Sequence, residues 1–165
     1  MIALVRVDNR LLHGQILEAW IPRLGIQEVV VGDDDAAASD LAQAAMCLCV
    51  PPDLPIRVLR VADVPWAELA RASRKVLVLV RDVAALAAAV RSGGLTPELG
   101  HRVNLGNVHF GPGRRPVTPS VFLAGPELDT LRQLAAAGFE LEARAIPSEP
   151  PAGLADIERR YEAAP

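Results

Sequence analysis

The chain has 165 residues, 51% apolar and 4% aromatic, so one domain of this length can bury an aliphatic core without disulfide staples. Its 17 Lys and Arg residues and 20 Asp and Glu residues give a net charge of −3, which lacks the basic footprint of a nucleic-acid-binding protein. Arg6 and Asp8 interrupt the first apolar run, unlike in a signal peptide, and no run reaches the roughly 18 apolar residues of a membrane span, so we expect a cytoplasmic protein.

The first elements alternate between strand and helix patterns. A strand is predicted over 2–7, followed by apolar residues at helical spacing over 15–24. Pro22 is expected to kink or end that helix, and Gly25 to stop it. The run 28–32 is apolar on both faces, which is typical of a buried parallel strand.

The alternation continues through the middle of the chain. An Ala-rich helix with an acidic start is predicted over 33–49, and a strand over 56–61. Asp63 is a candidate cap for a short helix. The clearest strand covers 75–80, and a helix over 83–90 follows it and ends at a glycine pair.

The last third adds shorter elements. A strand is predicted over 102–106, a Gly/Pro/Arg loop over 110–120, and a brief strand over 121–123. A helix over 125–138 comes next. The alternating pattern of 139–146 predicts an edge strand with one wet face, taken as antiparallel.

These elements predict an α/β fold, a single domain spanning 1–165 with a Pro-rich C-terminal tail from about 147 that carries a short helix. The sheet is expected to be open and mostly parallel, with six to seven strands and helices on both faces. Ligands of such sheets bind beyond the carboxyl ends of the strands. Polar loops leave that edge at 8–15, 33–35 and 106–115, which makes it the candidate site.

The loop 8–15, "DNRLLHGQ", combines groups suited to phosphoryl chemistry. His13 precedes a predicted helix N-terminus, where free backbone N–H groups favour an anion. Arg10 offers a fork of donors matched to a phosphoryl group, Gly14 allows close backbone approach, and Gln15 adds a neutral donor. Asp8 is placed to orient the imidazole or to hold Arg10. A neutral imidazole here can accept a phosphoryl group, although a lone loop histidine is more often simply solvated.

Other candidate residues have plainer interpretations. Asn107 and His109 can border the phosphoryl site, although a packing or turn role is favoured. A metal site at His13 lacks a second histidine at ligand spacing, since His101 and His109 are distant in sequence. The pair Arg114 and Arg115 is expected to be a solvated patch, with an acidic partner protein as the alternative.

The acidic run and the cysteines are also expected to be structural. Asp33 to Asp35 can hold magnesium, as in receiver domains, but helix-start acids are the favoured interpretation. Cys47 and Cys49 are one residue apart, a spacing that fits neither a redox motif nor a zinc site. Trp20 and Trp66 are expected to be core or interface residues.

The motif "VRVDNRLLHGQ" resembles the signature of the IIB component of the mannose/fructose/sorbose class of sugar phosphotransferase systems, which reads much like V-R-I-D-D-R-L-I-H-G-Q. Similar segments follow in order: "VVVGDDDAA", "RVNLGNVHF" and "AAAGFELEARAIP". The resemblance runs from Ile2 to about Pro147. Asn9 departs from it, because an aspartate is common at that position.

The resemblance implies a phosphorelay with His13 as the covalent carrier and Arg10 beside it. The IIA component, a protein-N(pi)-phosphohistidine donor, would phosphorylate His13, and the chain would phosphorylate a sugar arriving through the membrane components IIC and IID. No metal or organic cofactor is implied. The protein would be cytoplasmic and peripheral to the membrane permease, with its oligomeric state open and a dimer among the options. The alternative is a regulatory phosphoprotein of an incomplete system without sugar transport.

Overall fold

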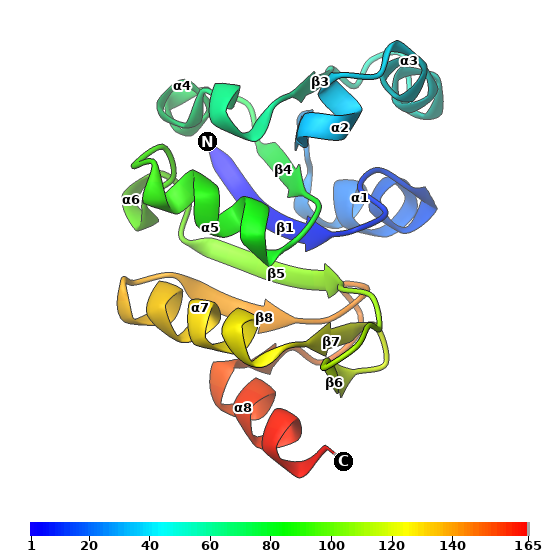
Figure 1. Ribbon diagram of the computed structural model, residues 1–165. Coiled ribbons are helices and arrows are strands. Elements are labelled where there is room, and N and C mark those ends of the chain that lie inside the picture. Colours follow the sequence, from blue (N-terminus) through cyan, green and yellow to red (C-terminus); the bar gives the residue numbers. More distant parts are fainter. Residues whose placement is uncertain (165) are drawn as a thin grey trace.

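A computed structural model describes residues 1–164, built around a seven-stranded sheet with the order β3-β2-β4-β1-β5-β8-β9 (Figure 1). All neighbouring strands pair in parallel except β8 and β9, which are antiparallel. The strands of this sheet are β1 (Ile2–Asp8), β2 (Glu28–Gly32), β3 (Ile56–Leu59), β4 (Val76–Val80), β5 (Arg102–Asn107), β8 (Glu140–Ala143) and β9 (Ala152–Gly153). The predicted fold class, an open and mostly parallel sheet whose last strand is an antiparallel edge, is confirmed.

Helices cover both faces of the sheet, as the alternating pattern predicts. The π-helical turn η1 (Ile16–Trp20) and α1 (Ile21–Leu24) pack on one face, where Leu4, Trp20 and Leu79 share a core cluster. Helices α5 (Val83–Arg91) and α7 (Gly125–Ala136) lie on the other face, toward the viewer in Figure 1, where Leu86 and Leu131 belong to a larger cluster. The remaining helical elements are α2 (Asp34–Ala37), α3 (Asp40–Cys49), the 3₁₀ turn η2 (Val61–Asp63), α4 (Trp66–Arg71), α5 (Val83–Arg91), α6 (Pro97–Gly100), α7 (Gly125–Ala136) and α8 (Leu154–Ala163). Within residues 1–164, no helix combines the length and the apolar character that crossing a bilayer demands.

The C-terminal part of the sheet differs from the sequence prediction. The segment 139–146 contains β8, which pairs in parallel with β5 and is not the antiparallel edge. The edge is β9, two residues inside the Pro-rich tail. The alternating pattern was misleading because α7 and α8 cover only one face of β8, and the other face carries Glu140 and Glu142.

The loop 110–120 is also partly a strand. Its residues Arg115–Thr118 form β6, which pairs antiparallel with β7 (Val121–Leu123) in a separate two-stranded sheet. The predicted strand 121–123 is therefore confirmed as a strand, but it lies outside the main sheet. Prolines at 116 and 119 concealed β6, because proline removes backbone donors and is confined to edges.

Several helix details follow local chemistry. Gly25 ends α1 in a left-handed conformation, with φ 63°, as predicted. Pro22 does not end the helix: it lies in the first turn of α1, immediately after the π-helical turn. Asp63 does not cap α4, since it lies in η2 and pairs with Arg60 instead. The Ala-rich segment divides into α2 and α3, because Ser39 caps the second helix through Ala42 N–H.

Candidate functional site

The loop after β1 turns the chain sharply into the first helical segment. The N–H of Leu11 donates to the carbonyl of Asp8 at 2.8 Å, and Leu11 has φ 53°, a left-handed conformation that is uncommon for leucine. Burial of the Leu11 side chain in the core cluster compensates for that conformation. The carbonyl of His13 then accepts from the N–H groups of Ile16 and Leu17, which places His13 at the start of the helix.

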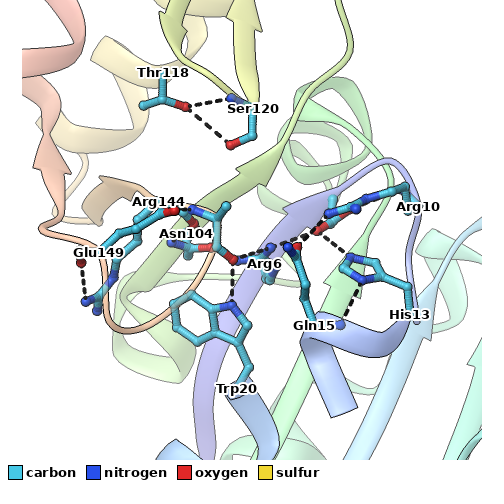
Figure 2. Close-up of polar contacts among 12 residues, drawn as sticks. Arg6, Arg10, His13, Gln15, Trp20, Asn104, Thr118, Ser120, Arg144 and Glu149 are labelled. Carbon is cyan, nitrogen blue, oxygen red and sulfur yellow. Dashed lines mark hydrogen bonds and ion pairs between the residues drawn. The ribbon is translucent and has the colours of Figure 1, made fainter. Parts of the chain in front are cut away.

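Each nitrogen of the His13 ring has a different partner. Nε2 lies 3.0 Å from Oδ2 of Asp8, and Nδ1 lies 3.3 Å from the backbone N of Gln15 (Figure 2). A backbone N–H can only donate, so Nδ1 carries the lone pair, and an ionised carboxylate can only accept, so Nε2 carries the proton. The ring is thus held as the Nε2–H tautomer, with Nδ1 as its nucleophilic atom. The His13 side chain is 16% exposed, so the ring is reachable from solvent.

Asp8 organises the whole loop. Its side chain is fully buried; Oδ2 accepts from Arg6 at 2.8 Å and Oδ1 accepts from the backbone N–H of Arg10 at 3.1 Å. Burial by itself would raise the pKa of Asp8, but the hydrogen bond from His13 and the charge and hydrogen bond of Arg6 outweigh it and lower the pKa below the ordinary value. Asp8 is therefore an ionised acceptor for His13 at neutral pH.

Arg10 and Gln15 form the rim beside the ring. Nε of Arg10 lies 3.4 Å from Oδ1 of Asp8, and Nη2 of Arg10 donates to the side-chain carbonyl of Gln15 at 3.0 Å. In Figure 2, Arg10 and His13 converge on the same carboxylate. Gln15 thus acts as an acceptor for Arg10, and its backbone N–H contacts the ring. A Cβ built on Gly14 meets no atom within 4 Å, so the folded chain alone does not require glycine there.

Beneath the loop lies a buried polar network that sequence reasoning missed. Arg6 donates to Asn104 of β5 and to the carbonyl of Ala145 after β8, and Trp20 donates to that same carbonyl at 2.9 Å. Burial lowers the pKa of Arg6, although Asp8 opposes this shift. One signal was available: Arg6 is a lone charge in an apolar strand, two residues before Asp8 and on the same face of the sheet.

The second candidate loop is adjacent to the first through its backbone. Asn107 pairs in register with Asp8, and its carbonyl accepts from Asn9 N–H at 3.1 Å. His109 is exposed, and within residues 1–164 its side chain forms no hydrogen bond or ion pair with His13. Arg114 is not a solvated patch residue, because it donates to the carbonyl of His109 at 2.8 Å and pairs with Glu127 at 2.7 Å. Arg115 stacks on the Tyr161 ring.

The acidic run at the end of β2 is structural, as favoured. Asp33 caps α2 through Ala36 N–H and forms a two-pronged ion pair with Arg81, with both contacts at 2.6 Å. Burial would raise the pKa of Asp33, but Arg81 and the Ala36 N–H outweigh it and lower the pKa. Across residues 1–164, no group of three or more His, Cys, Asp or Glu side chains is arranged to hold a metal ion. Cys47 and Cys49 are exposed free thiols, and Trp20 and Trp66 are buried core residues.

Comparison with known proteins shows the family of this chain. Residues 2–163 match the family model of the PTS system sorbose subfamily IIB component. The chain belongs to that family. As a member of this IIB family, it is 27% identical over 149 residues to an N-acetylgalactosamine-specific phosphotransferase enzyme IIB component 2 from Escherichia coli K12, a match covering 90% of this chain and 93% of that one.

Two further relatives extend the comparison. The mannose-specific EIIAB component of Escherichia coli K12 is 25% identical over 95% of this IIB chain, and the match covers 48% of that protein, so the chain spans about half the length of this relative. The crystal structure of manxB from Thermoanaerobacter tengcongensis superposes with a TM-score of 0.83 at 25% identity, covering 98% of this chain and 96% of that one.

Proposed function

We propose that the chain is a phosphoryl carrier of a sugar phosphotransferase system. His13 accepts a phosphoryl group from the IIA component and passes it to a sugar translocated by IIC and IID. The observation that carries this proposal is the pair of contacts on the His13 ring, with Nε2 on the buried Asp8 carboxylate and Nδ1 on the backbone N–H of Gln15. They keep the ring in one tautomer and leave the lone pair on the nitrogen nearer the helix start.

Phosphoryl uptake then proceeds by in-line displacement. The Gln15 N–H, which lies 3.3 Å from Nδ1, turns from the Nδ1 lone pair to an incoming phosphoryl oxygen. The Nδ1 lone pair then attacks phosphorus as the bond between phosphorus and the donor's ring nitrogen breaks, and the electron pair of that bond returns to the donor. Positive charge develops on the His13 ring, and Asp8 offsets it through the Nε2–H hydrogen bond. No proton has to move at His13 during uptake, because Nδ1 carries none.

The phosphoryl oxygens need donors on the same side of the ring. Arg10 supplies a guanidinium at the rim, with 39% of its side chain exposed and therefore free to reorient toward an anion. The backbone N–H of Gln15, beside the ring, adds a donor, and the start of the helical segment adds the positive end of the helix dipole. In the second transfer, a sugar hydroxyl attacks phosphorus, the electron pair returns to Nδ1, and the hydroxyl proton leaves to solvent or to a base of the membrane component.

The first half of the relay can be tested with labelled phosphoenolpyruvate, the two general phosphotransferase proteins and a IIA partner. We expect one acid-labile phosphoryl group per chain, which His13→Ala abolishes. His101→Ala is the matched control, because His101 lies at the amino end of β5 and His13 lies beyond the carboxyl end of β1. This variant should keep the label. His109→Ala tests whether the second loop contributes. Label that survives in His13→Ala would refute the proposal.

The second half separates transport from regulation. We place the chain at the cytoplasmic face of the membrane, docked on the permease during transfer. Membranes that contain IIC and IID should remove the label from His13 when the matching sugar is added, and an equal amount of sugar phosphate should appear. A chain that takes up the label and never yields it to any sugar would instead be a regulatory phosphoprotein.

A further inference from the structure

Arg6 is a buried cation that the phosphoryl chemistry of His13 does not obviously require. It lies on β1, two residues before Asp8, and none of its surface is exposed. A buried charge is unfavourable unless partners surround it, so its presence in the core requires a specific set of contacts. Those contacts come from β1, from β5, from the segment that follows β8 and from the first helical segment, so these elements meet at Arg6.

The partners of Arg6 hold both ends of its guanidinium. Nη1 donates to Oδ1 of Asn104 at 2.5 Å, and Nη2 donates to Oδ2 of Asp8 at 2.8 Å and to the carbonyl of Ala145 at 3.1 Å. The guanidinium carbon lies 4.9 Å from the centre of the Trp20 ring, within cation–π range. Figure 2 shows this network extending from Arg144 through Arg6 to the carboxylate that His13 contacts.

The absence of a side chain at Gly106 leaves room for the Arg6 guanidinium. A Cβ built on Gly106 would lie 1.9 Å from Cζ of Arg6, so any side chain at that position would collide with it. Gly106 is the next-to-last residue of β5 and is buried, and glycine is otherwise unfavourable within a strand. The sequence of β5 is thus matched to the position of Arg6 on the neighbouring strand.

The two oxygens of Asp8 are divided between Arg6 and the loop. Oδ2 accepts from both Arg6 and Nε2 of His13, while Oδ1 accepts from the backbone and side chain of Arg10. Because Arg6 holds Oδ2 and Arg10 holds Oδ1, the Asp8 carboxylate cannot rotate away from the His13 ring. We propose that Arg6 is a positioning residue for phosphoryl uptake, which fixes Asp8 so that Nδ1 of His13 stays free of a proton and open to the donor. This inference rests on the proposed function.

Arg6 also sets the charge balance around the ring. The other charged groups facing this cluster are Arg10 from the loop, and Glu142 and Arg144 from β8 and the segment after it. Without Arg6, the Asp8 carboxylate would be buried with too little positive charge nearby, and it would draw a proton onto the ring. A ring protonated on both nitrogens has no lone pair and cannot attack phosphorus.

The test compares Arg6→Met with the wild-type chain in phosphoryl uptake from the same IIA donor between pH 6 and 9. We expect the pH midpoint of uptake to move upward by about one unit, the usual effect of removing a nearby charge, and uptake at pH 7 to fall by up to about 10-fold as a result. Arg57→Met is the matched control, because Arg57 pairs with the buried Glu28 at 2.8 Å on the far strands β2 and β3. The control should leave the pH profile of uptake unchanged.

Nitrogen-15 NMR of the unphosphorylated ring separates this inference from the proposed function. The second ring nitrogen should lose its proton at a pH about one unit higher in Arg6→Met than in the wild type, even if no IIA donor phosphorylates the chain. Unchanged ring nitrogens together with an unchanged pH profile in Arg6→Met would overturn the inference. Should Arg6→Met not fold, Arg6→Lys decides: it keeps the charge but loses the forked contact, so uptake should fall several-fold with the pH midpoint kept, and unaltered uptake would overturn the inference.

Discussion

At the scale of single residues, His13 depends on a carboxylate that can only accept. Both oxygens of Asp8 face donors, with Arg6 and His13 on Oδ2 and Arg10 on Oδ1. An asparagine at position 8 would have an NH₂ group in place of one oxygen. That NH₂ group would face either the donors of Arg6 and His13 or the donor of Arg10. If the NH₂ faces His13, the ring must move its proton to Nδ1, which blocks the nucleophile.

We therefore predict that Asp8→Asn lowers the rate of phosphoryl uptake by about 10²-fold or more, as expected for a histidine held in the wrong tautomer. The measurement is single-turnover labelling from a IIA donor, with urea unfolding to show that the variant is folded. Asp53→Asn serves as the control, because Asp53 is exposed and far along the chain from the loop. A labelling rate within a factor of two of the wild type would show that Asp8 does not direct the tautomer.

What the sequence could predict about the site follows from continuity along the chain. Asp8, Arg10, His13 and Gln15 lie within one loop, so their proximity was visible, and the structure brings them into contact as expected. Arg6, Asn104 and Ala145 come from three strands or the segments after them, and only the sheet order β1-β5-β8 brings them together. Nothing local in the sequence encodes that order.

At the scale of elements, strands with both faces covered were the easiest to predict. Every residue of β2 and β4 is buried, which matches the apolar runs 29–32 and 76–80. Short strands are poorly predicted because they have little apolar pattern of their own. Two of the four residues of β6 are exposed, and β9 has only two residues. Their pairing depends on neighbours distant in sequence.

Helices α3 and α5 are both rich in alanine and leucine but differ in burial. Leu86 of α5 is fully buried between the sheet and its neighbours, whereas Leu48 of α3 is 87% exposed and no residue of α3 is buried. Ala42 and Met46 of α3 pack against the core cluster, but Leu41 and Leu48 face solvent, so core packing explains only part of its apolar composition. Helical periodicity alone could not distinguish the two helices.

This contrast predicts different costs for the same substitution. Leu86→Ala should lower the free energy of unfolding by about 2–5 kcal/mol, because it removes buried methyl groups and leaves a cavity. Leu48→Ala should change it by less than about 0.5 kcal/mol, because the side chain is mostly in water. Urea unfolding of both variants at pH 7 measures the difference. Equal losses would mean that α3 is covered in solution by a surface outside the described chain.

At the scale of the whole molecule, the fold places buried ion pairs at the carboxyl ends of neighbouring strands. Asp8 ends β1 and pairs with Arg6, and Asp33 follows β2 and pairs with Arg81. The two aspartates lie on either side of β4 in the sheet order. The same edge therefore carries the proposed reactive histidine and two acids with lowered pKa values. His13 and Arg6 lower the pKa of Asp8, and Arg81 lowers the pKa of Asp33.

These lowered pKa values set the response of the molecule to acid. A carboxyl group with a lower pKa in the folded state stabilises the protein above its unfolded pKa, near 4, and loses that contribution as the pH falls through the folded value. In that range the unfolded chain binds more protons, so the free energy of unfolding must decrease as the pH decreases. We predict a plateau above about pH 5 and a steady decline below about pH 4.

Asp33→Asn isolates one part of this response. Asparagine keeps the helix cap on Ala36 N–H but loses the ion pair with Arg81, so stability at pH 7 should fall by about 1–2 kcal/mol, a range reduced because Arg81 is partly exposed. The difference from wild type should shrink below pH 4, because the wild-type carboxyl is then protonated as well. Urea unfolding at pH 7, 5, 4 and 3 measures both effects, with Asp53→Asn as the exposed control. A difference that stays constant down to pH 3 would mean that the Arg81 contact does not depend on the charge of Asp33, and the acid response would then have to come from Asp8 and the loop it organises.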